Sequence, residues 1–200
     1  MYTLPKPLLV REELLNRGLR IFTPLEFGRV FQVQPYINKY FLEKQVDEGL
    51  LERLKQGIYA LKTDPPSEEE IANKLYAPSY ISFEYALAHY SIIPEMVYEV
   101  TSATTKPTRL FSTSNLAYSY RTIKKEAYTG YRLEKVGERQ YLIADPEKAL
   151  VDYLYFWALG KHSLNDRLNI SSLKKEKLLE YAKLYNRKKL IVEIERMYDH

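Results

Sequence analysis

Two carboxylates and a lysine lie close together at Asp145-Pro146-Glu147-Lys148, a combination that could bind a metal ion and activate water, as in a nuclease. The same residues match a helix start. Aspartate is a good N-cap, proline suits the first helical position, and glutamate favours the positive end of the helix dipole. A metal nuclease would place its lysine on a neighbouring strand, whereas Lys148 falls inside the helical pattern. We expect a helix start and keep the nuclease as an alternative.

A second chemically suggestive group is Ser82 with Glu84 and His89, which could belong to a hydrolase. No G-x-S-x-G turn surrounds Ser82, and its position also suits the cap of a helix. His89 follows Tyr85 by one helical turn and is typical of a helix-surface or packing residue. These residues therefore favour structural roles, and we expect a protein that is not an enzyme.

Cofactor and metal chemistry have little support in the chain. It has no cysteine, which excludes disulfides and thiolate metal sites, and its three histidines are too few for a typical zinc site. Walker, dinucleotide-binding and HExxH motifs are absent from the sequence, so no cofactor is expected. No apolar run approaches the roughly 20 residues that span a bilayer. Charges interrupt every apolar stretch near the N-terminus, so we expect no signal peptide and a cytoplasmic protein.

The charges are unevenly distributed along the 200 residues, although the net charge is only +4. Residues 1–62 hold ten Lys/Arg and seven Asp/Glu, residues 63–159 hold ten and thirteen, and residues 160–200 hold ten and six. Basic ends and an acidic middle indicate weakly that the ends contact phosphate.

The basic N-terminal segment is predicted to contain helices followed by a β-hairpin. A leucine-rich stretch ending at Gly18 predicts a first helix, and a short extended stretch follows at 21–22. The Thr23-Pro24-Leu25-Glu26 sequence is a capping box that opens a helix over 24–31. A third helix is expected over 35–48. Strands at 50–54 and 58–62 then form a hairpin. This order is typical of a winged helix-turn-helix, spanning about residues 7–62 in a domain at 1–63.

Such a domain places its third helix in the major groove and its hairpin against the phosphate backbone. Ile37, Phe41 and Leu42 are expected to face inward. Glu43 and Glu52 would repel phosphate, so dimerisation or repeated sites would have to strengthen binding. The alternative is a protein-interaction module with solvated basic residues. The predicted DNA-binding side chains are Gln34, Tyr36, Lys39, Tyr40, Lys44, Arg53, Lys55 and Gln56.

The second segment, residues 64–200, predicts an α+β domain with a mostly antiparallel sheet flanked by helices. Ser67 and Glu70 form a capping box for a helix to about Tyr76, and a further helix follows Ser82. Alternating or β-branched stretches predict strands between residues 97 and 144. Helices are expected after Asp145-Pro146, over 171–185 and over 187–198.

Three stretches of this segment resemble the AbiEi family of type IV toxin–antitoxin, or abortive-infection, systems. They are APSYISFEYAL (77–87), VTSATT with the following TRLF (100–111), and IADPEKALVDYLY (143–155). The hairpin LLERLKQGIYAL also looks like the wing of that family. The likeness covers about residues 8–160. The motif residues are Pro78, Ser82, Glu84, Arg109, Asp145, Pro146, Glu147, Lys148 and Asp152.

The resemblance implies a winged helix that binds repeats in its own promoter, followed by an antitoxin domain. It also implies a nucleotidyltransferase-like toxin as functional partner, without a stable complex, in phage defence. Ser91 stands where many members have glycine, and the part after Gly160 matches poorly, which puts complete antitoxic function in doubt. A regulator that senses a ligand through its second domain, without a toxin, is the alternative.

Two further basic features could bind nucleic acid or have a purely structural role. Arg109 could contact a nucleic acid or the toxin, or pair internally with Asp145 or Glu147, and we favour the internal pair. The run Asn186-Arg187-Lys188-Lys189 could touch phosphate or form a solvated surface, and we favour the solvated surface.

Overall fold

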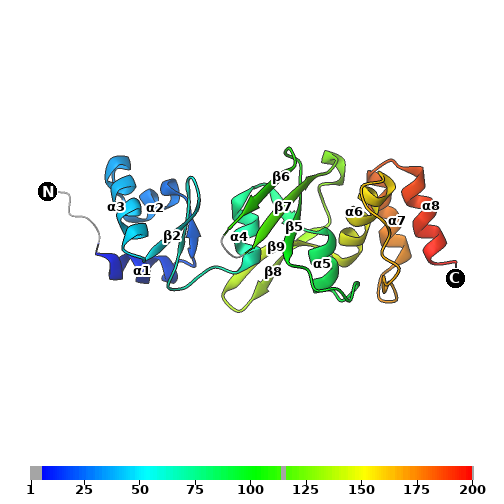
Figure 1. The fold of residues 1–200 in the computed structure, drawn as a ribbon, viewed down its shortest axis with the longest axis horizontal. Coiled ribbons are helices and arrows are strands. Elements are labelled where there is room, and N and C mark those ends of the chain that lie inside the picture. The colour runs from blue at the N-terminus through cyan, green and yellow to red at the C-terminus, as the bar shows by residue number, and fades with distance from the viewer. Residues whose placement is uncertain (1–5, 114–115, 200) are drawn as a thin grey trace. The chain divides into compact units, whose positions relative to one another are not determined.

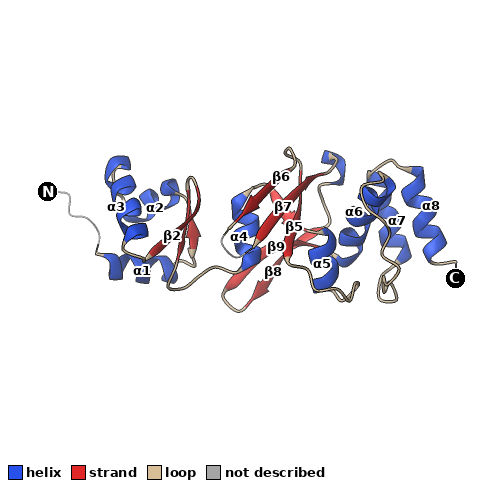
Figure 2. Cartoon of the chain, viewed as in Figure 1, coloured by secondary structure: helices blue, strands red, loops and turns tan. Residues whose placement is uncertain are grey.

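The computed structural model describes residues 6–113 and 116–199, which form an α+β protein. Figure 1 shows the order of its elements and Figure 2 their types. The chain divides into two compact units. The first contains the chain up to Leu75 together with Lys135–Gln140, and the second contains Tyr76–Glu134 and the chain from Tyr141 onward. Along the described ranges, no helix combines the length and apolar character needed to cross a bilayer.

The first unit combines helices with a small antiparallel sheet whose strand order is β1-β3-β2. Phe22, Phe27, Phe41 and Leu42 belong to its buried core. The expected helices and hairpin at 7–62 are present. The elements are α1 (Pro7–Asn16), β1 (Ile21–Phe22), α2 (Pro24–Phe31), α3 (Pro35–Asp47), β2 (Leu51–Lys55), β3 (Ile58–Leu61) and α4 (Glu68–Leu75).

Local sequence explains where these elements begin and end. The Thr23 hydroxyl accepts from the Glu26 backbone N–H at 3.3 Å, and the Glu26 carboxylate accepts from the Thr23 N–H at 2.7 Å. The predicted capping box of α2 is therefore confirmed. Ser67 and Glu70 make the same reciprocal pair at the start of α4. Gly57 has a φ of +77° in the hairpin turn, a conformation that glycine adopts without steric cost.

The second unit is built around a six-stranded mixed sheet with the order β6-β7-β5-β4-β9-β8. β4 pairs with β9 in parallel and β5 with β7 in parallel, whereas β4–β5 and β6–β7 are antiparallel. The expectation of a mostly antiparallel sheet missed both parallel pairings. The strands are β4 (Ser79–Ile81), β5 (Glu99–Thr104), β6 (Arg109–Ser112), β7 (Ala117–Thr122), β8 (Tyr131–Val136) and β9 (Arg139–Ala144).

Strand β4 was not predicted, because a three-residue strand is too short to display alternation. This strand nevertheless lies between β5 and β9, and all three of its residues are buried. Pro78 immediately precedes it, and the Ala77–Pro78 peptide bond is cis.

Helix α6 organises the helical part of the second unit, packing against α5, α7 and α8. The α6 residues from Glu147 to Leu154 are all buried. α7 begins at Lys175 and not at residue 171 as expected. Ser91, which follows α5, has a φ of +55°, a conformation that favours glycine. The helices are α5 (Phe83–His89), η1 (Lys125–Ala127), α6 (Pro146–Ala158), α7 (Lys175–Leu184) and α8 (Lys188–Met197).

Candidate nucleic-acid interface and polar clusters of the second unit

Helix α3 has one buried and one exposed face. Phe41 and Leu42 are buried in the core of the first unit, as expected from the sequence. Tyr36 and Tyr40 are 70% and 58% exposed, and the Lys39 side chain is 77% exposed. These three residues occupy one side of the helix because they are separated by three and four positions. We call Tyr36, Lys39 and Tyr40 the α3 face.

Acidic side chains of the same helix moderate its positive charge. The Lys39 ammonium lies 4.0 Å from a Glu43 carboxylate oxygen, and the Lys44 ammonium lies 3.6 Å from Glu48. Both are exposed i,i+4 pairs, which salt screens readily. Gln34 stands at the N-cap and is exposed, and its side chain makes no capping bond.

The hairpin keeps two of its three predicted phosphate-contacting side chains at the surface. Arg53 and Gln56 are exposed. Lys55 instead donates to the backbone carbonyl of Leu75 at the end of α4. A lysine suits this position because the last carbonyls of a helix lack intrahelical partners. The structure therefore places Lys55 in an intramolecular contact and corrects its assignment to the phosphate-binding set.

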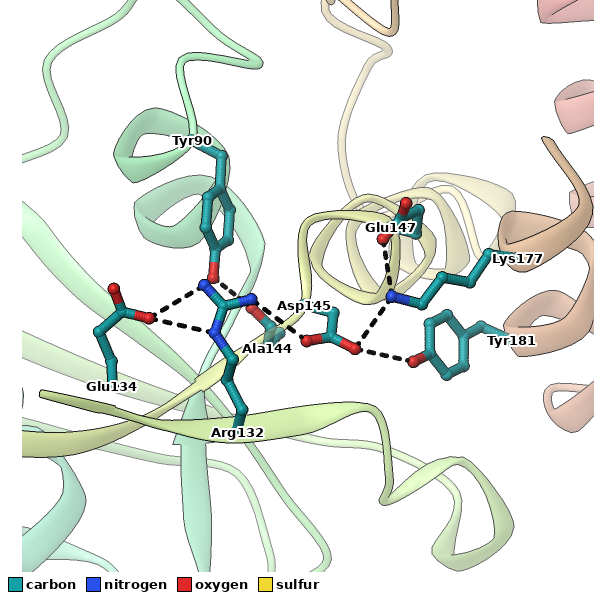
Figure 3. Close-up of polar contacts among 8 residues, drawn as sticks. All are labelled: Tyr90, Arg132, Glu134, Ala144, Asp145, Glu147, Lys177 and Tyr181. Carbon is teal, nitrogen blue, oxygen red and sulfur yellow. Dashed lines mark hydrogen bonds and ion pairs between the residues drawn. The ribbon is translucent and has the colours of Figure 1, made fainter. Parts of the chain in front are cut away.

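In the second unit, Asp145 lies at the centre of a polar cluster (Figure 3). One of its carboxylate oxygens is 3.5 Å from Arg132, and the other accepts from Lys177 and from the Tyr181 hydroxyl, each at 3.1 Å. Asp145 occupies the N-cap of α6, but its side chain makes no capping bond. The predicted position is confirmed, while the capping role of the carboxylate is wrong because these three partners engage it.

Glu147 extends this cluster to the start of α7. Its Oε2 lies 3.1 Å from the Lys177 ammonium, and its Oε1 accepts from the Lys174 backbone N–H at 3.4 Å. Lys177 thus bridges two carboxylates of α6, and these charged neighbours raise its pKa against the opposing effect of burial. The expected pairing of Arg109 with Asp145 or Glu147 is wrong. Arg109 is exposed on β6, and the carboxylates are engaged by Arg132 and Lys177.

Asp152 is the centre of a second cluster, which is completely buried. Its carboxylate accepts from Tyr185 at 2.5 Å, Ser82 at 2.8 Å and Tyr80 at 3.0 Å, and it also binds the Lys148 ammonium. Burial lowers the pKa of Lys148, and the adjacent Asp152 opposes that shift. Burial raises the pKa of Tyr80 and Tyr185 well above the usual range. This cluster satisfies the hydrogen-bonding groups of Asp152 in the interior.

These contacts correct the predicted role of Ser82. It stands at the N-cap of α5 without a capping bond, and its hydroxyl donates to Asp152. The side chain of Thr101 accepts from the Tyr85 backbone N–H at 3.1 Å instead. The motif residue Glu84, on α5, forms an ion pair with Arg121 of β7 at 2.9 Å. It therefore belongs to neither polar cluster.

The nuclease alternative requires Lys148 to share a site with Asp145 and Glu147. Its ammonium instead points to Asp152 in the interior, with the side chain 0% exposed. Among residues 6–113 and 116–199, no three His, Asp or Glu side chains are grouped so that they could hold a metal ion. His200 lies outside the described residues.

Four of the residues that contact Asp145 and Asp152 in these clusters were not predicted from the sequence. Arg132 and Lys177 reach Asp145 from β8 and α7, and Tyr80 and Tyr185 reach Asp152 from β4 and the end of α7. More than ten residues separate each of these partners from its carboxylate, so no local spacing reveals the contacts. The family motifs named other members of the clusters, Asp145, Glu147, Lys148 and Asp152 at residues 143–155 and Ser82 at residues 77–87, but none of these four partners.

A cavity of the second unit lies beside α5. Its volume is about 660 Å³, and its lining includes His89, Ile93, Glu95, Met96 and Arg167. The Arg167 guanidinium binds the Glu95 carboxylate at the edge of this cavity.

The chain was compared with protein-family models and with curated proteins, and neither comparison gives a match.

Proposed function

We propose that residues 1–63 form a winged helix-turn-helix that binds double-stranded DNA, with α3 in the major groove and the β2–β3 hairpin on the phosphate backbone. The observation that carries this proposal is the α3 face. It is mostly exposed, contains a lysine and two tyrosines, and lies on a helix whose opposite face is buried in the core of the first unit. A helix of this kind fits the major groove.

The hairpin supports the same assignment. Arg53 and Gln56 are exposed on β2 and in the following turn, where a wing would meet phosphate. With Lys55 directed to Leu75, the cationic contribution of the hairpin is smaller than the sequence suggested. We therefore expect weak binding by one copy and cooperative binding by a homodimer to inverted repeats.

On the strength of the family resemblance, we further propose that the protein is a cytoplasmic autoregulator and antitoxin of a type IV system. It would repress its own promoter through the first domain. Through residues 64–200 it would counter a nucleotidyltransferase-like toxin without forming a stable complex. This division of labour agrees with the two compact units, since both polar clusters form entirely within the second unit.

A second candidate is a DNA-binding regulator that senses a small molecule and has no toxin partner. The 660 Å³ cavity beside α5 favours it, because this volume is typical of a small-molecule site. The neighbouring gene distinguishes the candidates. An adjacent nucleotidyltransferase-like reading frame supports the antitoxin, and its absence supports the ligand-sensing regulator.

The experiment that tests DNA binding is a gel shift of the full chain on the region upstream of its own gene, with an unrelated duplex of equal length as control. We expect a retarded complex that weakens with added salt and prefers the upstream region. If the full chain retains no duplex even at low ionic strength, the proposal is wrong. Toxin neutralisation by the same protein in cells is measured separately.

A further inference from the structure

Helix α3 has few of the side chains that most often read purines. It contains no arginine, and its two amide side chains, Asn38 and Gln45, are buried. Their amide nitrogens are used within the first unit, by the Pro24 carbonyl and by Glu48 at 2.6 Å. Arginine or lysine reads guanine, and asparagine or glutamine reads adenine, through paired hydrogen bonds in the major groove. Within α3, Lys39 is therefore the one exposed side chain of the guanine-reading kind, and no exposed amide is present to read adenine.

The α3 face offers aromatic surface instead. The rings of Tyr36 and Tyr40 lie one helical turn apart and are mostly exposed. Thymine is the base that presents a methyl group in the major groove, and apolar side chains recognise it by direct contact. A tyrosine ring supplies such a surface with few rotatable bonds to order.

The charges beside these rings favour base edges over phosphate. Glu43 lies one turn after Lys39 and 4.0 Å from its ammonium. A carboxylate is repelled by the backbone, but it can accept a hydrogen bond from the amino group of cytosine. The middle of α3 is therefore better suited to the floor of the groove than to its phosphate walls.

We propose that α3 reads thymine through contact of the Tyr36 and Tyr40 rings with thymine methyl groups. This inference rests on the proposed DNA binding. Residues four apart are separated by about 6 Å along a helix, and stacked bases by about 3.4 Å. The two methyl groups consequently lie on the order of two base-pair steps apart, in each half of the recognised site.

The test uses the full chain and a duplex selected by it from a randomised library. Each thymine of that duplex is replaced singly by deoxyuridine, which removes the methyl group and preserves base pairing. We expect about fourfold weaker binding at two positions of each half-site, the effect of one lost methyl contact. Tyr40→Ala should abolish the difference in affinity between thymine and deoxyuridine at one of the two positions, and Tyr36→Ala should abolish it at the other.

Two controls separate ring contact from other effects. Tyr40→Phe keeps the ring and should keep the sensitivity to deoxyuridine. Tyr98→Ala removes a tyrosine of the second unit that is 76% exposed and should change neither position. If the chain retains the duplex but binds deoxyuridine and thymine equally everywhere, thymine reading is wrong while DNA binding stands. If it retains no duplex at low salt, both proposals fall.

Discussion

The Lys177 ammonium lies 3.1 Å from Oδ2 of Asp145, joining α7 to the N-cap of α6. Thirty-two residues separate the two in the chain. The same ammonium reaches Glu147 at 3.1 Å, so a single lysine bridges both carboxylates of the Asp-Pro-Glu-Lys motif (Figure 3). A sequence that could be taken for a metal-binding site is thus engaged in holding helices together.

This pair should be measurable by a double-mutant cycle. Asp145→Ala and Lys177→Met should each lower the free energy of unfolding, with a coupling of about 1 kcal/mol because the pair is only partly buried. Urea denaturation gives all four free energies. The more exposed pair Lys175–Asp199 serves as control, with a smaller expected coupling. Strict additivity of Asp145→Ala and Lys177→Met would contradict the prediction.

The buried cluster should be sensitive to which charge is removed. Asp152→Ala leaves the Lys148 ammonium buried without its counter-ion, and should lower the free energy of unfolding by about 3–5 kcal/mol. Lys148→Met should cost less, because the carboxylate would still accept from Ser82, Tyr80 and Tyr185. Chemical denaturation ranks the two variants. The opposite ranking would show that the hydroxyl groups do not stabilise the carboxylate.

Gly130 is required for two reasons that can be separated. Its φ is +74°, and an added Cβ would approach the Tyr181 ring to 2.6 Å. Gly160 has a similar φ of +72° with nothing within 4 Å of an added Cβ. Gly160→Ala should cost about 1 kcal/mol of stability from backbone strain alone. Gly130→Ala should cost about 2 kcal/mol more from the clash. Equal melting temperatures for the two variants would exclude the close approach.

Stability should fall in alkaline solution. Burial raises the pKa of Tyr90, Tyr128 and Tyr181 to about 12, above the ordinary tyrosine value of 10.0. The unfolded chain therefore loses these protons first, and the stabilisation present below pH 10 is lost as the pH rises towards 12. The lowered pKa of Lys148 makes stability rise with pH instead, but only at pH values below 10.5, the pKa of an unfolded lysine.

The suitable measurement is urea denaturation at several pH values between about 10.5 and 12, with phenolate absorbance followed in parallel. The free energy of unfolding should decrease throughout this range. Tyr90→Phe should make the decrease shallower, since one of the shifted phenols is then absent. A stability that is flat or rising with pH would contradict the assigned shifts.

The proposed DNA contacts give a prediction in salt dependence. Lys44→Ala with Arg53→Ala should weaken binding to the upstream duplex, and should flatten the slope of log K against log salt by about 2, since each phosphate contact contributes about 0.9. Lys161→Ala with Arg196→Ala removes the same charge from exposed positions of the second unit, and should leave the slope unchanged. Equal slopes for the two double variants would show that the groove-facing surface is misassigned.

Local sequence was sufficient where the deciding contacts are local. The capping boxes at Thr23 and Ser67, the hairpin turn at Gly57 and the inward face of α3 were all predicted correctly. Each depends on residues within a few positions of one another, or on a helical period that the chain displays directly. The identity of α3 as an exposed helix with two outward tyrosines therefore follows from the sequence itself.

Tertiary structure decided which partner each polar side chain takes. Asp145 and Ser82 occupy their predicted cap positions, yet their side chains bind Lys177 and Asp152, which come from distant segments. Lys55 was assigned to phosphate, but folding brings the Leu75 carbonyl at the end of α4 within its reach. A partly buried polar group bonds to whichever polar group lies next to it after the chain has packed. Local sequence does not specify that neighbour. The short central strand β4 likewise exists because its neighbours β5 and β9 complete its hydrogen bonds.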